Sequence, residues 1–369
     1  MTYAADQQIR PKNGQKCYRI AVIPGDGIGT EVTASALQVI NHVADKYNFL
    51  CTFENKPWGC EFFRASGAMM PEDGLAQLSD TDAIMLGAVG HPDVADHVSL
   101  WGLLIPIRRA FSQNVNLRPV RLFPGIASPL RQVPPSGLDF VIVRENTEGE
   151  YSQVGGRFSS GIRDEMAIQE SIFTRAGCER ILRYAFDLAR KRRKMLTVAT
   201  KSNGIVHTMP FWDEIASEVA ENYPDVERRV MHIDALAAKF VLDPGAQDVV
   251  VASNLFGDIL SDLGAALAGS IGIAPSANLN PDGTFPSMFE PVHGSAPDIV
   301  GKGIANPIGA IWSASMMLEH LGQHEAAHAI TEALMAATAT RSSRTPDIGG
   351  TASTTDVTTA VLDFLSSRP

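Results

Sequence analysis

Short apolar runs alternate with longer amphipathic stretches along most of the chain. The runs are rich in Val, Ile, Leu and Met and are too short for helices, which favours buried strands, whereas the longer stretches repeat apolar positions at helical spacing. Strands are predicted at residues 18–24, 83–86, 139–144, 195–200 and 248–253, and helices at residues 30–47, 177–193, 209–223 and 357–365. This succession predicts an α/β fold built on buried, largely parallel strands.

Several predicted strands end at residues able to carry chemistry, namely Arg144, Lys201 and Asn254. In open α/β sheets, ligands gather at the carboxyl ends of the strands. This placement favours a functional interpretation of these side chains over a purely structural one.

Two irregular segments separate the predicted elements. Residues 148–169, with glycines at 155–161, could form a protruding hairpin that pairs with a partner subunit, or a plain surface loop. Residues 275–307 are rich in Gly, Pro and Asn and predict a long ligand-binding loop, since long loops in compact domains are usually functional.

A pair of acidic residues is the most informative chemical feature of the chain. Asp258 and Asp262 are four apart in a predicted helix and therefore share a face. Two carboxylates there repel each other unless a cation lies between them, and a hard dication with oxygen ligands, including Asp234 as a third, would remove that cost. The alternative is that both aspartates lie in the first turns of a helix and favour its dipole. The residues alone leave the two interpretations about even.

Basic and phenolic side chains could complete a site for an acidic substrate. Arg108, Arg118 and Arg144 would suit a dicarboxylate because guanidinium groups bind carboxylates with paired hydrogen bonds, although any one of them alone is more simply a surface residue. Lys201 could be a base or an ordinary solvated lysine. Tyr151 could be an acid if nearby cations lowered the pKa of its phenol from about 10, or a tyrosine at the edge of the core.

Two further patterns favour simple structural explanations. Residues 24–30 miss the dinucleotide-binding fingerprint because Thr30 stands where a small residue is needed, so a tight strand-to-helix turn is preferred. His320, His324 and His328 are spaced like a metal stripe, but Gly322 weakens that helix and a solvated helix face is the preferred interpretation.

Composition narrows the class of protein. The chain has 369 residues, 45% of them hydrophobic, which suggests two domains. A formal charge of −10 argues against nonspecific binding to nucleic acid or membranes. Four cysteines without Cys-x-x-Cys spacing, a polar segment at residues 1–16 unlike a secretory signal, and no long apolar run lead us to expect a cytoplasmic protein.

Five motifs in order along the chain resemble the β-decarboxylating dehydrogenases of (2R)-hydroxy acids, a family that includes isopropylmalate, isocitrate and tartrate/D-malate dehydrogenases. They lie at residues 18–32, 116–119, 143–149, 257–262 and 290–307, and are highly specific as a set. The resemblance implies the isopropylmalate-dehydrogenase-like fold, which is not a Rossmann fold. It also implies one domain joining residues 1–115 with 269–369, a second domain at 116–268 with a dimerising hairpin arm, and a homodimer with shared active sites.

The resemblance also implies roles for individual residues. Arg108, Arg118 and Arg144 would bind the substrate carboxylates, and Lys201 and Tyr151 would be the catalytic base and acid. Asp258, Asp262 and the partner's Asp234 would bind Mg²⁺ or Mn²⁺, and K⁺ often assists this family.

The segment after Glu290 resembles the family's adenosine-binding loop. His293, Gly294 and Asn306 would contact the cofactor, and Asp298-Ile299 stands at the position that sorts NAD from NADP. Because a carboxylate accepts the ribose hydroxyls and repels a 2′-phosphate, NAD is the expected cofactor.

Residues 99–108 distinguish the members of the family by substrate. The usual Glu of isopropylmalate enzymes is replaced by Trp101, and the Ser and Asn of isocitrate enzymes are replaced by Gly102 and Leu104. The pattern resembles the tartrate/D-malate group, in which Trp101 could fill the space of a larger substrate's side chain. The expected reaction is therefore NAD-dependent oxidation and β-decarboxylation of D-malate or tartrate, with 3-isopropylmalate as the alternative substrate. Pro106 could kink this segment.

Overall fold

The computed structural model describes residues 14–135 and 137–367 of the chain. Most of the N-terminal segment discussed above, residues 1–13, lies outside the described residues, as do residues 136, 368 and 369. Within the described part of the chain, no helix is long and apolar enough to cross a membrane.

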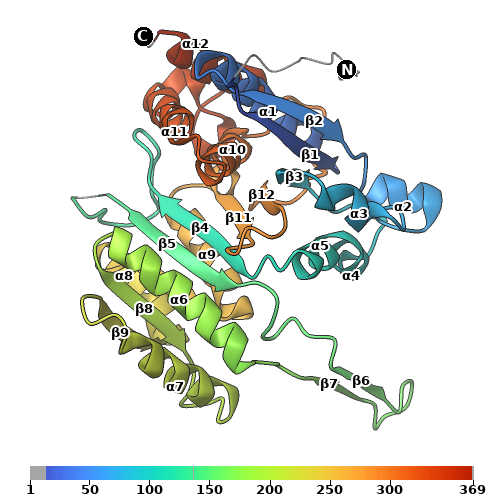
Figure 1. Cartoon of the computed structure of the whole chain (residues 1–369), viewed down its shortest axis with the longest axis vertical. Coiled ribbons are helices and arrows are strands. Elements are labelled where there is room, and N and C mark those ends of the chain that lie inside the picture. Colours follow the sequence, from blue (N-terminus) through green and yellow to red (C-terminus); the bar gives the residue numbers. More distant parts are fainter. Residues whose placement is uncertain (1–13, 136, 368–369) are drawn as a thin grey trace.

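The structure is built on one ten-stranded sheet with helices on both sides (Figure 1). The strand order is β2-β1-β3-β12-β11-β4-β5-β10-β8-β9. The strands are β1 (Cys17–Gly25), β2 (Leu50–Asn55), β3 (Ala83–Ala88), β4 (Val115–Arg121), β5 (Asp139–Glu145), β8 (Met195–Thr200), β9 (Glu227–His232), β10 (Val249–Ala252), β11 (Pro275–Leu279) and β12 (Ser287–Pro291).

Helices gather in two groups, one at each end of the sheet (Figure 1). One group packs beside β1–β3 and consists of α1 (Gly29–Lys46), α2 (Cys60–Ser66), α3 (Gly74–Ser79), α4 (Asp96–Ser99), α5 (Ile105–Ala110), α10 (Ile308–His320), α11 (His324–Ala339) and α12 (Thr354–Ser367). The other packs beside β5, β8, β9 and β10 and consists of α6 (Arg175–Lys191), α7 (Thr208–Ala220), α8 (Ile233–Leu242) and α9 (Asn254–Leu267). The sheet runs unbroken between the two groups.

Side-chain alternation along β1 explains how the sheet is covered on both faces. Ile20 and Val22 belong to the larger apolar core, which includes α1 and α10, whereas Ala21 and Ile23 belong to a smaller core with residues of α2 and α5. Successive strand residues point to opposite faces, so a run that is apolar throughout must be buried on both. This is why strands such as β3 and β10 are continuous apolar runs in the sequence.

The predicted strands and helices are confirmed to within a few residues, and the strands are largely parallel, as expected. Six neighbouring pairs in the sheet are parallel, whereas β4 and β11 are antiparallel to both of their neighbours. The expected long loop at residues 275–307 was wrong in its first half, which forms β11 and β12. Pairing between strands far apart in sequence overrides the turn-like composition there.

The predicted hairpin is present as β6 (Gly155–Phe158) and β7 (Met166–Gln169), which extend away from the rest of the molecule (Figure 1). The expected stretches were residues 148–154 and 162–169. The first strand instead begins at Gly155, which pairs with Gln169, and residues 151–154 are not in a strand.

The turn between β1 and α1 is the tight strand-to-helix connection that was preferred above. The Ile28 amide donates to the carbonyl of Ser295 at 2.9 Å, and a side chain at Gly27 would meet that carbonyl oxygen at 2.1 Å. Gly27 also has a positive φ of 58°. Gly27 therefore permits close backbone contact between this turn and the loop after β12.

Pro106 follows a π-helical turn, Leu100–Leu104, that joins α4 to α5. The Ile105 amide donates to Leu100, five residues back, rather than four. Pro106 has no N–H and its ring would clash with the preceding turn of a regular helix, so the wider turn relieves that conflict. The irregularity expected at Pro106 is thus confirmed as a π-helical turn.

Candidate active site

A cleft of ≈ 210 Å³ lies where strands from both ends of the sheet meet. The last residues of β3, the π-helical turn, α5, β4, β5 and the loop after β12 supply its walls. Its charged and polar lining residues are Arg108, Arg118, Arg144, Tyr151, Asp258, Ser276, Glu290 and His293. All three arginines named by the sequence are therefore in one cleft, together with Tyr151 and Asp258.

Arg144 is the most rigidly held of the three arginines. It is 1% exposed, and its Nε and Nη2 donate to Oδ1 of Asn254 at 3.1 and 2.7 Å while Nη1 pairs with Asp258. Gly257 permits this arrangement, since a side chain there would lie 2.6 Å from Cβ of Arg144. Both partners come from α9, so the start of this helix fixes the guanidinium at the end of β5.

Arg118 joins the two aspartates of α9. Its Nη1 lies 3.1 Å from Asp258 and 3.9 Å from Asp262, and it also donates to Ser261 at 2.6 Å. The guanidinium compensates part of the repulsion between the carboxylates, and with Arg144 it helps to hold the pKa of Asp258 below its usual value against the effect of burial.

The two aspartates lie beyond the first turn of α9, which begins at Asn254 after the N-cap Ser253. Helix-dipole stabilisation falls off within the first turn, so the structure does not support that alternative. Burial and the nearby Asp258 raise the pKa of Asp262 even though Arg118 opposes this. The site thus contains a carboxylate pair that additional positive charge would stabilise, which fits a dication.

The described residues of this chain do not supply a third carboxylate to this pair, since no three His, Cys, Asp or Glu side chains among them form a metal-binding group. Asp234 instead pairs with Lys201, whose Nζ lies 2.9 Å from its Oδ1, and is largely exposed. Neither residue lines the cleft that contains Arg144 and Asp258. The predicted site residues of this chain therefore lie in two separate places. Arg144 and Asp258 are in the cleft, whereas Lys201 and Asp234 are outside it.

Arg108 forms a buried ion pair with Glu290, whose Oε1 lies 2.8 Å from Nη2 of Arg108 and also accepts from Asn278 at 2.7 Å. The buried Nε atoms of Arg108 and Arg118 have no hydrogen-bond partner among the described residues. Buried donors normally have partners, so these two nitrogens are unsatisfied donors on arginines that line the cleft.

Tyr151 lies against the aspartate–arginine cluster. Its hydroxyl donates to Oδ2 of Asp258 at 2.8 Å, and its ring is 5.5 Å from the Arg144 guanidinium. Desolvation and Asp258 raise the pKa of the phenol although Arg144 and Arg118 act to lower it. The acid role predicted for Tyr151 required nearby cations to lower the pKa of its phenol, and this chain alone does not meet that condition. Tyr151 therefore stays protonated at neutral pH.

The predicted cofactor residues lie on and beside the loop after β12. His293 is buried; its Nδ1 lies 3.0 Å from the carbonyl of Gly294, its Nε2 has no partner among the described residues, and desolvation lowers the pKa of the imidazole. Asp298 is exposed, Ile299 packs against the core, and Asn306 donates to Asp347 at 2.9 Å. The loop thus presents one free carboxylate and one unpartnered buried imidazole nitrogen.

Two residues that line the cleft, Glu290 and Leu100, were not predicted from the sequence. Glu290 was assigned no role, although a carboxylate at the end of an apolar strand signals a buried partner. Leu100 lines the cleft together with Leu104, whereas Trp101 packs over Arg109, 5.0 Å from its guanidinium. The expectation that Trp101 fills substrate space is not supported, because the π-helical turn rotates Leu100 inward.

The histidines do not form a metal stripe in the described structure. Glu319 lies 2.8 Å from His324, and Glu332 lies 3.2 Å from His328. Two helices, α10 and α11, meet at Gly322, so the three histidines are not on one helix. All four cysteines are free.

Comparison with known proteins gives a consistent result. The model of the isocitrate/isopropylmalate dehydrogenase family matches residues 19–361. D-malate dehydrogenase [decarboxylating] of Escherichia coli (strain K12) is 56% identical over 95% of this chain and 99% of its own, and tartrate dehydrogenase/decarboxylase of Pseudomonas putida is 54% identical over 95% and 98%. Crystallographic isocitrate dehydrogenase from Methylococcus capsulatus has a TM-score of 0.85 at 34% identity, covering 94% of this chain and 99% of its own.

Proposed function

This chain belongs to the isocitrate/isopropylmalate dehydrogenase family, and from that premise we propose that it is an NAD-dependent, dication-requiring dehydrogenase that oxidises D-malate or tartrate and decarboxylates the resulting keto acid. One observation carries the proposal. Three buried or nearly buried arginines converge with Asp258 and Tyr151 in one small cleft.

The arginines account for a substrate with two carboxylates. Arg118 and Arg144 are tied to Asp258, and Arg108 is tied to Glu290, so each guanidinium is pre-oriented before substrate arrives. Bidentate guanidinium–carboxylate contacts provide both charge and direction. The volume of ≈ 210 Å³ suits a four-carbon acid.

Isopropylmalate is the rival substrate because Leu100 and Leu104 give the cleft an apolar wall. One methylene group in an apolar pocket discriminates by only about 1–3 kcal/mol, and the isopropyl group that distinguishes this rival from D-malate has three carbons. The two decarboxylating relatives compared above favour D-malate or tartrate.

The chain's own residues would act in sequence on the bound acid. The arginines hold the carboxylates and fix C2, and Lys201 of the second subunit takes the proton of the 2-hydroxyl. After loss of CO₂, the phenol of Tyr151 donates a proton to the carbon that carried the carboxylate. A general acid works best when its pKa lies near the operating pH, so the dication bound beside Asp258 would have to lower the pKa of Tyr151 from the raised level that it has in this chain alone.

Two groups from solution would complete the chemistry. Asp258 and Asp262, with Asp234 of the second subunit, would hold Mg²⁺ or Mn²⁺, which polarises the oxygen atoms of the substrate and stabilises negative charge as it develops. His293, Gly294, Asp298, Ile299 and Asn306 would hold NAD, which accepts the hydride from C2. The family resemblance adds K⁺ as an activator.

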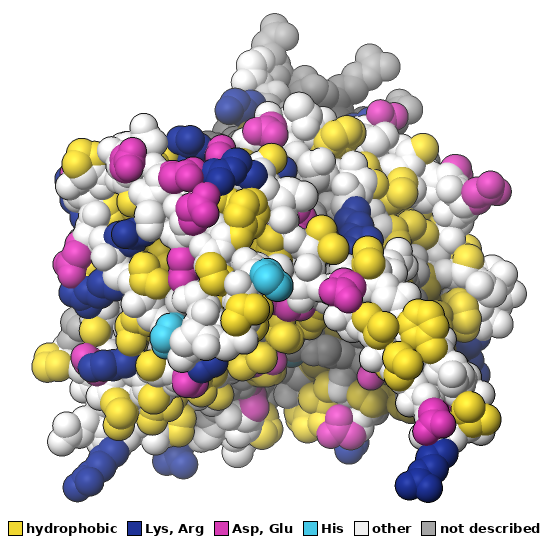
Figure 2. All heavy atoms as spheres, turned by 90° about the horizontal axis from the view of Figure 1, so that it is seen from below, with side chains coloured by type: hydrophobic (Ala, Val, Ile, Leu, Met, Phe, Trp, Pro, Cys, Tyr) yellow, Lys and Arg dark blue, Asp and Glu magenta, His cyan; other side chains and the backbone are white. Residues whose placement is uncertain are grey.

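A homodimer with shared sites follows from the division of the predicted residues. Lys201 and Asp234 pair with each other outside the cleft, so a second subunit is needed to bring their counterparts to it. Large apolar side chains are exposed on the hairpin and on β9, α8 and α9, a pattern typical of an interface: Phe158, Ile162, Met166, Ile168, Val230, Val241, Leu242 and Ile259. The face seen in Figure 2 likewise carries hydrophobic side chains among charged ones.

The same proposal divides the chain into a cofactor domain of residues 1–115 and 269–369 and a substrate and dimerisation domain of residues 116–268. The cleft has lining residues from both segments, with His293 and Arg108 from the first and Arg144 and Asp258 from the second. Movement of one domain against the other would therefore open or close it.

The decisive experiment measures NADH formation from D-malate, both tartrate enantiomers, 3-isopropylmalate and isocitrate, each with NAD or NADP. We expect D-malate or a tartrate to give the highest kcat/KM with NAD and Mn²⁺, and a chelator to abolish the rate, which excess Mn²⁺ restores. No NADH from any of these acids would contradict the proposal, and a preference for 3-isopropylmalate would favour the rival substrate.

Coenzyme choice is expected to depend on the carboxylate of Asp298. In the Asp298→Lys variant, the ratio of kcat/KM for NAD to that for NADP should fall by about 10-fold or more, because a cation attracts the 2′-phosphate that the carboxylate repels. Steady-state kinetics with both coenzymes provides the measurement. Asp282→Lys, in the exposed turn between β11 and β12, is the matched control and should leave the ratio unchanged. An unchanged ratio in Asp298→Lys would remove Asp298 from the coenzyme site.

A further inference from the structure

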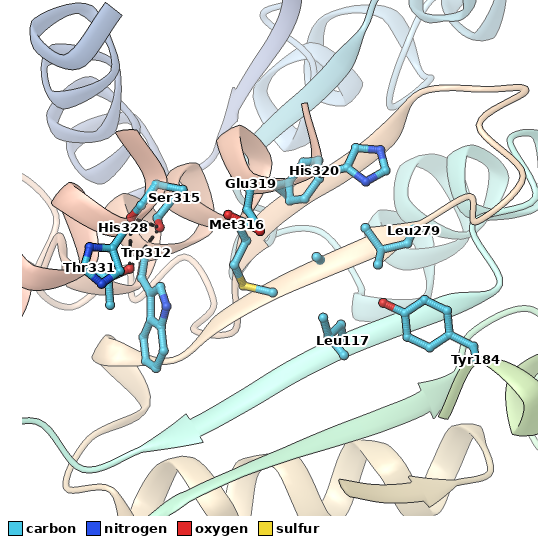
Figure 3. A pocket seen from close by; sticks show the side chains of 13 residues that line it. Leu117, Tyr184, Leu279, Trp312, Ser315, Met316, Glu319, His320, His328 and Thr331 are labelled. Atoms are coloured by element: carbon cyan, nitrogen blue, oxygen red, sulfur yellow. Dashed lines mark hydrogen bonds between the residues drawn. The ribbon is translucent and has the colours of Figure 1, made fainter. Parts of the chain in front are cut away.

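A second cavity, of ≈ 410 Å³, lies between α10, α11, α6 and the middle of the sheet (Figure 3). It is larger than the active-site cleft and shares no lining residue with it. Its apolar wall consists of Leu117, Ala277, Leu279, Phe289, Trp312 and Met316. Cavities of this size and lining are typical of sites for small organic molecules.

Most polar groups of this cavity already have partners. Ser315 and Thr331 lie 3.1 Å apart, and both donate to the carbonyl of Ala327. Glu319 and His328 are engaged in the ion pairs described above. These groups therefore have little need of a ligand.

Three polar groups in the cavity make no hydrogen bond to the described residues: the Tyr184 hydroxyl, the Trp312 indole and the imidazole of His320, whose ring centroid lies 5.6 Å from that of Phe289. The Trp312 side chain is only 7% exposed, and its indole N–H makes no hydrogen bond to the described residues, but this nitrogen is not among the fully enclosed atoms that lack a partner. The hydroxyl of Tyr184, on α6, also has no partner among the described residues, and Figure 3 shows it directed toward Leu117 and Leu279 rather than away from the cavity. Burial raises the pKa of this phenol to about 12, so it remains a neutral donor.

Three strands carry the cavity on one face and the active site on the other. Leu117, Ala277 and Phe289 line the cavity, whereas their neighbours Arg118, Ser276 and Glu290 line the active-site cleft. Alternate strand residues point to opposite faces, so both sites share β4, β11 and β12. A ligand that shifts one of these strands must move side chains at both sites.

We propose that this cavity is a second ligand site, which takes a neutral, largely apolar small molecule bearing a hydrogen-bond acceptor oxygen, and that its occupancy is linked to substrate affinity. The apolar wall holds the body of the molecule. Tyr184 and Trp312 donate to its oxygen. The carboxylate of Glu319 at the cavity disfavours an anionic ligand.

Coumarin, which is planar, neutral and carries only acceptor oxygens, is a suitable probe. Ligand-observed NMR titration of the whole protein should give a Kd of about 1 mM or below, as expected for a fragment-sized molecule. Tyr184→Phe should weaken binding by about 3- to 10-fold, and Met316→Trp, which fills the cavity, should abolish it. Tyr223 follows α7, stacks on Phe186 of α6 and lies outside the cavity, so Tyr223→Phe is the matched control and should bind as the unmodified protein does.

Linkage is tested by reciprocity. Saturating coumarin should change KM for D-malate by about 3-fold or more, and D-malate should change the Kd of coumarin by a similar factor, since coupling between two binding sites is reciprocal. No binding, or binding that Met316→Trp leaves intact in a variant with an unchanged melting temperature, would overturn the site. Binding without a mutual shift would overturn the linkage. The NMR arm does not depend on catalysis, so failure of the proposed activity would be recognised separately.

Discussion

Replacement of Lys201 by alanine is expected to lower kcat for D-malate oxidation by about 10²–10⁴-fold, the usual loss when a general base is removed. The Lys201 ammonium lies 2.9 Å from Asp234, so the two side chains would enter the second subunit's cleft together. Because the arginines bind the carboxylates independently, KM should change much less than kcat. Steady-state NADH formation provides both parameters.

Lys239→Ala is the matched control, since Lys239 also pairs with an aspartate in the same region, 3.4 Å from Asp243, but lies outside the proposed site. Its kcat should remain near that of the unmodified enzyme. If Lys201→Ala kept full activity, another group would have to be the base.

Mixing two inactive variants tests whether each active site is built from two subunits. Lys201→Ala and Tyr151→Phe chains, each inactive as homodimers, should regain about a quarter of the normal activity when dissociated and reassembled together, because half of the dimers then contain one intact site. No recovery, with heterodimers demonstrated by mass spectrometry, would indicate that each site is built from one chain.

Replacement of Arg144 by lysine is expected to lower kcat/KM by about 100-fold or more, although the charge is retained. The guanidinium holds Asn254 through two nitrogens and Asp258 through a third, and lysine has neither the fork nor the reach to do this. Each lost bond to a charged group removes about 1.5–3 kcal/mol. We expect the loss to appear in both KM and kcat, because substrate and the Asp258 carboxylate are mispositioned together.

Arg175→Lys is the control, as this exposed arginine pairs with Glu214 and Glu218 outside the cleft. It should leave kcat/KM within about 2-fold of the unmodified value, and thermal unfolding of both variants separates loss of function from loss of fold. An Arg144→Lys enzyme with normal kcat/KM would show that the pre-oriented guanidinium is not needed for substrate binding.

The sequence by itself determined many of the elements and identified most of the charged residues that meet in the cleft. Continuous apolar runs such as Val249–Ala252 must be buried on both faces, and the helical spacing of Asp258 and Asp262 follows from geometry within one helix. Arg144 and Asn254 were recognised because they end such strands. These inferences depend on neighbours in sequence, where local periodicity is sufficient.

Contacts between distant segments were decided only by the tertiary structure. The antiparallel strands β11 and β12 form in a segment with turn-like composition, because they pair with β4 and β3. The Arg108–Glu290 ion pair joins residues 182 positions apart, and Leu100 rather than Trp101 faces the cleft because a π-helical turn precedes Pro106. The cavity behind the sheet is likewise assembled from β4, α6, β11, β12, α10 and α11. No local pattern encodes such contacts, since their free energy depends on surfaces that meet only after the chain has folded.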